Sequence, residues 1–142
     1  MPLLELERAT SGYGQSAILH DVELYVDAGE IVSIVGPNGA GKSTAMKLVF
    51  GLLKPWQGAV RFAGEDISGV PPERLVRRGM AYVPQVANVF RTLTVEENLE
   101  MGAFTISGPL DARKQRVYDL FPRLAERRRQ RAGQMSGGER QM

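Results

Sequence analysis

One stretch of nine residues has the residue types and the spacing needed to hold a phosphate group. It reads GPNGAGKST and consists of Gly36, Pro37, Asn38, Gly39, Ala40, Gly41, Lys42, Ser43 and Thr44. It fits the pattern G-x-x-x-x-G-K-[ST], in which glycines allow backbone amides to approach phosphate oxygens. Lys42 can then reach the β- and γ-phosphates, and the Ser43 hydroxyl can ligate Mg²⁺. The alternative interpretation is a glycine-rich turn that binds nothing.

The elements expected around this stretch place it at the start of a helix. An apolar, β-branched run over residues 31–35 is typical of a strand covered on both faces. Apolar residues at helical spacing predict a helix over 42–52. The unpaired amides and the positive dipole end of that helix would face the anion. Because the motif lies where its mechanism needs it, the sequence favours nucleotide binding over an empty turn.

Shorter segments precede and follow this core. Alternating apolar residues predict strands at 4–7 and 18–26, joined by a glycine-punctuated loop that contains Tyr13. Further strands are expected over 59–64 and 80–84, and a short helix over 71–79, where proline stands at the start and glycine at the end. The order is a small β-rich start followed by an α/β middle.

The last third of the chain has helical signals. Thr94 and Glu97 have the spacing of a capping box, which predicts a helix that begins there and ends at about Met101. An apolar stripe follows, interrupted by Pro122; its members are Val117, Leu120, Phe121 and Leu124. The sequence therefore predicts a helical end to the chain.

Composition excludes several classes of site. The 142 residues include no cysteine, so disulfides and thiolate metal sites are excluded. The first ten residues lack the pattern of a signal peptide, and no apolar run is long enough to cross a membrane. Nine basic and four acidic residues lie from Asp111 onward, against nine and twelve before it. This basic excess can meet nucleic acid or anionic lipid, but a solvated helix face is the preferred interpretation, and no nucleic-acid partner is expected.

A second motif narrows the class of nucleotide-binding protein. The sequence MSGGERQ, at 135–141, resembles the signature of the ATP-binding-cassette (ABC) ATPases, L-S-G-G-Q, with Met for Leu and Glu for Gln. Tyr13 matches the aromatic residue that stacks on adenine in that family, and Gln85 matches the glutamine of its Q-loop. At finer grain, the stretches at 89–104 and 120–142 resemble the ATP-binding subunits of branched-chain amino-acid or urea importers.

The resemblance implies a fold and a set of site residues. The fold class is α/β, a P-loop NTPase of the ABC type with an antiparallel β subdomain at 1–30, a P-loop core at 31–85 and a helical subdomain at 86–142. ATP would be held by Tyr13 and by the nine residues of the phosphate loop, and Mg²⁺ by Ser43 and Gln85. Gln85 would also contact the attacking water. The signature residues would contact the γ-phosphate of ATP on a second subunit; they are Ser136, Gly137, Gly138 and Glu139.

The implied partners and location follow from the same family. They are a second copy or a paralogous ATP-binding subunit, transmembrane permease subunits and, indirectly, a solute-binding protein. The location would be cytoplasmic, on the inner face of the cell membrane. Family members continue past the signature to an Asp-Glu pair that holds Mg²⁺ and polarises water. Since the chain stops before it, we expect the fold to be incomplete at the C-terminus and residues 1–142 alone to be inactive as an ATP hydrolase.

Two alternatives stay open at the level of sequence. One is a nucleotide-binding or regulatory module that switches without hydrolysis. The other is a cassette ATPase that acts outside transport, on ribosomes or DNA; such proteins usually carry long inserts or duplicated cassettes, and neither is present here.

Overall fold

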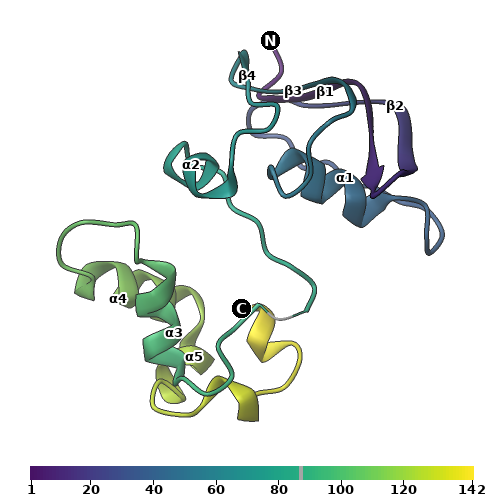
Figure 1. The fold of residues 1–142 in the computed structure, drawn as a ribbon. Coiled ribbons are helices and arrows are strands. Elements are labelled where there is room, and N and C mark those ends of the chain that lie inside the picture. Colours follow the sequence, from purple (N-terminus) through teal and green to yellow (C-terminus); the bar gives the residue numbers. More distant parts are fainter. Residues whose placement is uncertain (87) are drawn as a thin grey trace. The chain divides into compact units, whose positions relative to one another are not determined.

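The computed structural model describes residues 1–86 and 88–142, and the chain divides into two compact units. The first unit is Met1–Tyr82 and the second is Val83–Met142. Figure 1 shows the sheet and α1 in the first unit and the helices α3, α4 and α5 in the second. In the described part of the chain, no helix is long and apolar enough to cross a membrane.

An antiparallel sheet forms the scaffold of the first unit. Its strand order is β2-β1-β3-β4, and the strands are β1 (Leu4–Tyr13), β2 (Ser16–Val26), β3 (Gln57–Phe62) and β4 (Glu65–Asp66). In β1, Leu6 and Ala9 are buried, whereas the intervening charged side chains reach solvent. Leu4 packs against the same core as Leu6, so the predicted period-two alternation selects the inward face at the start of β1; Ala9 lies three residues from Leu6, beyond a register shift in the pairing with β2.

The loop expected around Tyr13 is mostly strand. Tyr13 pairs with Ser16, and Gly12 pairs with Ala17, so β1 and β2 form one long hairpin whose turn is only two residues. Gly14 has φ of 58° and supplies the left-handed backbone that such a turn needs. The expectation of a longer loop was wrong because the glycines serve a tight turn and a close strand approach. As a consequence Tyr13 is held at the end of a strand.

Helix α1 (Lys42–Val49) packs on this sheet. Ala45 and Leu48 are buried in one cluster with Leu6, Val60 and Leu75. The helix ends three residues before the expected 52, because the chain turns at Gly51, whose φ is 71°. The remaining helix of this unit, α2 (Pro72–Arg77), has proline at its first position, as predicted.

Two strands that the sequence predicts are not formed. Residues 31–35 have no strand assignment, and Ile31 and Val35 are 95% and 88% exposed. Residues 80–84 likewise have no strand assignment. A strand exists only where a neighbour accepts and donates its ladder hydrogen bonds, and no described strand pairs with either segment. The apolar run at 31–35 is therefore present without the cover that such a run usually has.

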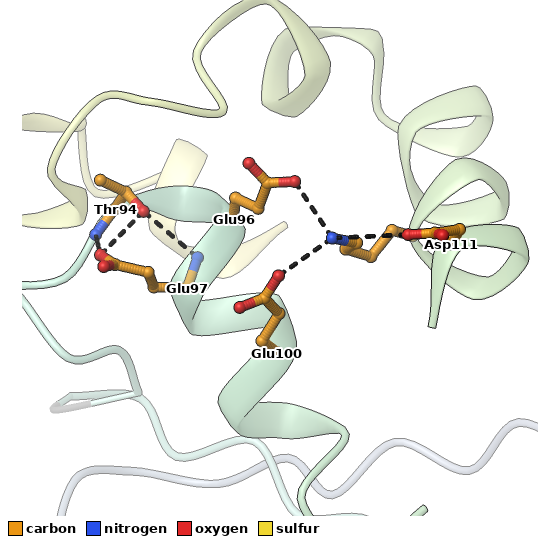
Figure 2. Close-up of polar contacts among 6 residues, drawn as sticks. Thr94, Glu96, Glu97, Glu100 and Asp111 are labelled. Atoms are coloured by element: carbon orange, nitrogen blue, oxygen red, sulfur yellow. Dashed lines mark hydrogen bonds and ion pairs between the residues drawn. The ribbon is translucent and has the colours of Figure 1, made fainter. Parts of the chain in front are cut away.

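Helix α3 (Val95–Gly102) begins the helical unit with the predicted capping box. The Thr94 hydroxyl accepts from the Glu97 amide at 3.2 Å, and the Glu97 carboxylate accepts from the Thr94 amide at 2.7 Å. Figure 2 shows these reciprocal bonds, with Glu96 and Glu100 on the adjacent face of α3. Both backbone amides would otherwise lack a partner at the helix start. The capping box is confirmed.

An ion cluster joins α3 to α4 (Asp111–Leu120). The ammonium of Lys114 lies 2.9 Å from a Glu100 oxygen and 3.1 Å from a Glu96 oxygen, and Asp111 is 3.9 Å away. Figure 2 shows Glu96, Glu100 and Asp111 around this group. The hydrogen bond to Glu100, and to a smaller extent the one to Glu96, raise the pKa of Lys114 above its usual range.

The core of the second unit is small and lies between α3 and the end of the chain. Its buried members are Val95, Leu124, Ala132 and Met135. Leu124 belongs to α5 (Pro122–Glu126), and two single 3₁₀ turns follow, η1 (Ala132–Gln134) and η2 (Glu139–Gln141). The predicted apolar stripe is only partly buried. Leu124 is buried, but Leu120 is 73% exposed, because α4 ends at Leu120 and helical spacing does not continue across Phe121 into α5.

Candidate nucleotide-binding site

The phosphate loop leads directly into α1. Gly41 precedes the first helical residue, Lys42, and has φ of 88°. The backbone conformation favours glycine, and a Cβ there would lie 2.9 Å from the Leu19 Cδ2 atom, so that side chain would also have to shift. Gly39 also has a positive φ, 87°. The loop therefore has the left-handed positions that allow successive amides to face one anion.

The ammonium of Lys42 is held over the loop that precedes it. Its Nζ atom donates to the carbonyl oxygens of Gly36 and Pro37, each at 2.7 Å. These contacts keep a positive charge at the place where the loop amides and the start of α1 also favour an anion. A phosphate oxygen is a stronger acceptor for an ammonium than a peptide carbonyl, because the bond is then between opposite charges.

The two hydroxyl residues at the start of α1 differ in exposure. Ser43 is exposed, whereas Thr44 is buried at 6%. An exposed hydroxyl in the first helical turn can ligate a hard cation, which prefers oxygen donors. The donor chemistry of Ser43 therefore fits Mg²⁺, whereas the buried Thr44 side chain lies against Tyr13, whose hydroxyl it hydrogen-bonds.

Tyr13 lies beside α1 in the same unit. The residue is 46% exposed, and its hydroxyl oxygen accepts from the Lys47 ammonium at 3.2 Å. The same ammonium is 5.4 Å from the ring centroid. The hydrogen bond with Lys47, and to a smaller extent one with Thr44, lower the pKa of the Tyr13 hydroxyl. Sequence reasoning missed Lys47, because the contact joins residues 34 positions apart and no local pattern marks it.

The signature segment is a tight turn stabilised by its own side chains. The Ser136 amide donates to the Glu139 carboxylate at 2.9 Å, and the Ser136 hydroxyl accepts from the Glu139 amide at 3.3 Å. These bonds, and Arg127 at 3.3 Å, lower the pKa of Glu139, with the Ser136 amide as the largest cause. The segment ends in one 3₁₀ turn, η2, and Gly137 and Gly138, which directly precede it, are exposed.

Gln85 lies near the signature segment within the second unit. Its carbonyl oxygen accepts from the Gln141 side chain at 3.2 Å, and the Asn88 side chain donates to the Arg140 carbonyl at 2.7 Å. A cavity of about 450 Å³ is lined by residues from both stretches, including Gly137. The sequence did not mark Asn88, Arg140 or Gln141, because each contact spans more than 50 residues. The structure thus brings Gln85 and the signature together in one unit, and Tyr13 and the phosphate loop in the other.

Comparison with known proteins agrees with these motifs. A family model described as "ABC transporter" matches residues 19–142, which include the phosphate loop, Gln85 and the signature. The chain belongs to the ABC transporter family. This membership accounts for the presence of both motifs in one chain, and the two alternatives outside the family of transport ATPases are not favoured.

Several curated relatives of this ABC chain match it over almost its full length. A high-affinity branched-chain amino acid transport ATP-binding protein, BraG of Pseudomonas aeruginosa, is 45% identical over 99% of this chain and 60% of its own. A probable branched-chain amino acid transport ATP-binding protein, LivF of Archaeoglobus fulgidus, is 41% identical over the same shares. The chain therefore spans about 60% of the length of these relatives.

Solved ABC structures share the fold. A nucleotide-free ATP-binding cassette of an ABC transporter has a TM-score of 0.83 at 28% identity, over 99% of this chain and 61% of the other. An ATP-binding subunit of an ABC transporter has a TM-score of 0.82 at 33% identity, over 98% and 58%. The expected fold class, a P-loop ATPase of the ABC type, is confirmed.

Proposed function

We propose that this chain binds ATP through its phosphate loop and Tyr13. The observation that carries the proposal is the construction of the loop: Gly41 in the left-handed conformation, α1 beginning at Lys42, and the Lys42 ammonium poised over the loop carbonyls. The loop amides and Lys42 would hold the β- and γ-phosphates. The exposed ring of Tyr13 would stack on adenine, since an aromatic face suits any base.

Magnesium would be held by the Ser43 hydroxyl, together with phosphate oxygens and Gln85. Bound there, the ion would neutralise charge that develops on the transferred phosphoryl group. Lys42 would stabilise the same charge, and the amide side chain of Gln85 would orient the attacking water. The Gln85 side chain is exposed, so it is accessible for that role.

The signature segment would serve a second subunit. Ser136, Gly137 and Gly138 would contact the γ-phosphate of ATP bound to a second copy of this chain or to a paralogous ATP-binding subunit. Ser136 and the exposed glycines offer a hydroxyl and unobstructed amides, which are suitable donors for an anion. Glu139 supports the turn rather than the anion, since its carboxylate is bonded to the Ser136 amide.

The whole protein would couple ATP binding and hydrolysis to solute import, with branched-chain amino acids as the solute. The support for this class is the description of BraG and LivF, at 45% and 41% identity. Its partners would be transmembrane permease subunits and, through them, a solute-binding protein. Its place would be the cytoplasmic face of the cell membrane.

The first experiment is ATP binding by this chain and by Lys42→Ala. Removing a charged hydrogen-bond partner costs about 1.5–3 kcal/mol, so we expect binding to weaken about 10- to 150-fold. Lys54→Ala is the matched control, since Lys54 is exposed and outside the loop. Equal affinities in the two variants would contradict the proposed site.

The second experiment tests the solute. A strain lacking the full-length gene is assayed for uptake of labelled leucine, isoleucine and valine, and is complemented with the wild-type gene or with Lys42→Ala. We expect only the wild-type gene to restore uptake. Unchanged uptake in the deletion strain would show that the solute class is wrong, whatever the result for ATP binding.

A further inference from the structure

The side chain of Lys47 joins the adenine-binding candidate to the phosphate-binding helix. Lys47 belongs to α1, whose first residue is Lys42, and its ammonium donates to the Tyr13 hydroxyl at 3.2 Å. The distance to the ring centroid is longer, 5.4 Å, so the ammonium approaches the hydroxyl end of the ring. Tyr13 is still 46% exposed, so much of the residue stays accessible while its hydroxyl is bonded to Lys47 on α1.

We propose that Lys47 is a positioning residue for the base of the nucleotide: it holds the ring of Tyr13 at a set distance from the phosphate loop, in the orientation in which adenine stacks. This inference rests on the proposed function, in which Tyr13 stacks on adenine and Lys42 binds the phosphates. In this role Lys47 itself contacts neither the adenine base nor the phosphates.

The geometry explains why such a contact matters. Tyr13 is the last residue of β1, next to the two-residue turn of the hairpin, where a side chain has few neighbours. An exposed aromatic side chain loses rotamer freedom when a ligand stacks on it, which weakens binding. The bond from Lys47 removes that freedom before the ligand arrives. Lys42 and Lys47 both lie on α1, so the residue that binds the phosphates and the residue that holds the Tyr13 ring belong to one rigid element.

A direct role in phosphate binding is the competing interpretation of a second lysine on α1. The two roles differ in which part of the nucleotide they affect. Loss of a phosphate ligand weakens the binding of any triphosphate, whereas loss of a base-positioning residue weakens only ligands that have a base. Inorganic tripolyphosphate, which has no base, therefore separates them.

The test measures dissociation constants for ATP and for tripolyphosphate with the whole protein. The variants are Lys47→Met, Tyr13→Phe and the double variant, with Lys54→Met as the matched lysine control. Tyr13→Phe keeps the ring and removes the hydroxyl. We expect each single variant to weaken ATP binding about 2- to 10-fold, which corresponds to ordering one side chain. Tripolyphosphate binding should not change.

The double variant decides whether the two residues act together. If Lys47 acts through the Tyr13 hydroxyl, the double variant should bind ATP no more weakly than the weaker single variant. Losses of ATP affinity that multiply in the double variant, or a loss of tripolyphosphate affinity in Lys47→Met, would overturn this proposal, whereas the proposed function would stand as long as the wild-type protein binds ATP. Absence of ATP binding by the wild-type protein would overturn both this proposal and the proposed function.

An optical titration provides a readout that a general loss of structure would not produce. The ultraviolet absorbance of tyrosinate is followed against pH, and the Tyr13→Phe titration is subtracted to isolate Tyr13. The ammonium of Lys47 favours the phenolate, which is why the pKa of Tyr13 lies below its usual value. We expect this pKa to rise in Lys47→Met and to stay in place in Lys54→Met. An unchanged value in Lys47→Met would show that the contact is absent in solution.

Discussion

Replacing Met135 with alanine tests whether the signature segment is supported by the core of the second unit. Met135 is only 6% exposed and packs with Val95, Leu124 and Ala132. It stands directly before Ser136, the first residue of the signature turn. Loss of its side chain should therefore loosen both the core and the chain that leads into the signature.

The size of the effect follows from burial. Because Met135 is almost fully buried, nearly all of its transfer free energy applies, about 1.5–3 kcal/mol. Methionine-to-alanine changes in cores cost about 2–5 kcal/mol when a cavity remains. The buried cluster here is small, so its neighbours can partly close the space. We therefore expect about 2 kcal/mol, at the low end of that range, and about 1 kcal/mol or less for Met135→Leu, which conserves volume.

Amide hydrogen exchange measures this locally. The Ala132 amide donates to the Leu93 carbonyl at 2.9 Å, within the same core, and its exchange should become roughly 30-fold faster in Met135→Ala. The control is Met101→Ala, because Met101 is 45% exposed in the same unit. The Ile67 amide, in the first unit, should keep its rate. An unchanged Ala132 rate in Met135→Ala, or an equal increase in Met101→Ala, would refute the reasoning.

Two further predictions concern single features of the second unit. Thr94→Ala removes an acceptor of the capping box and should lower the stability of α3 by about 1 kcal/mol, whereas Thr94→Ser should cost little. The measurement is hydrogen exchange of the Asn98 amide, which donates to the Thr94 carbonyl. Hydrogen bonds with Thr94 lower the pKa of Glu97. The contribution of the capping box to the stability of α3 is therefore fully present above the unfolded pKa of that carboxyl and is lost as pH falls through the folded pKa. A stability of wild-type α3 that does not change over this acid range would contradict the prediction. Gly137→Asp places a carboxylate where a second subunit's γ-phosphate is proposed to lie, and a Cβ there meets no described atom within 4 Å. ATP-driven dimerisation should fall while monomer binding of ATP persists, measured by sedimentation and equilibrium binding; loss of monomer binding would place Gly137 elsewhere.

Local features were predicted well from the sequence. The phosphate loop, the start of α1 at Lys42 and the capping box of Thr94 and Glu97 are all formed as expected. Each depends on residues that are close in sequence: glycines that permit a left-handed backbone, or a hydroxyl and a carboxylate three positions apart. The free energy of such features comes mainly from neighbours in the chain, so their residue types and spacing are sufficient evidence.

Other features were decided only by the tertiary structure. The apolar run at 31–35 has the composition of a buried strand, yet it is exposed, because pairing with a neighbouring strand is what forms a strand. The contacts of Lys47 with Tyr13 and of Gln141 with Gln85 join residues that are 34 and 56 positions apart. Nothing in the local sequence marks them, because a long-range hydrogen bond depends on where the fold places two side chains and not on what surrounds either one in the chain.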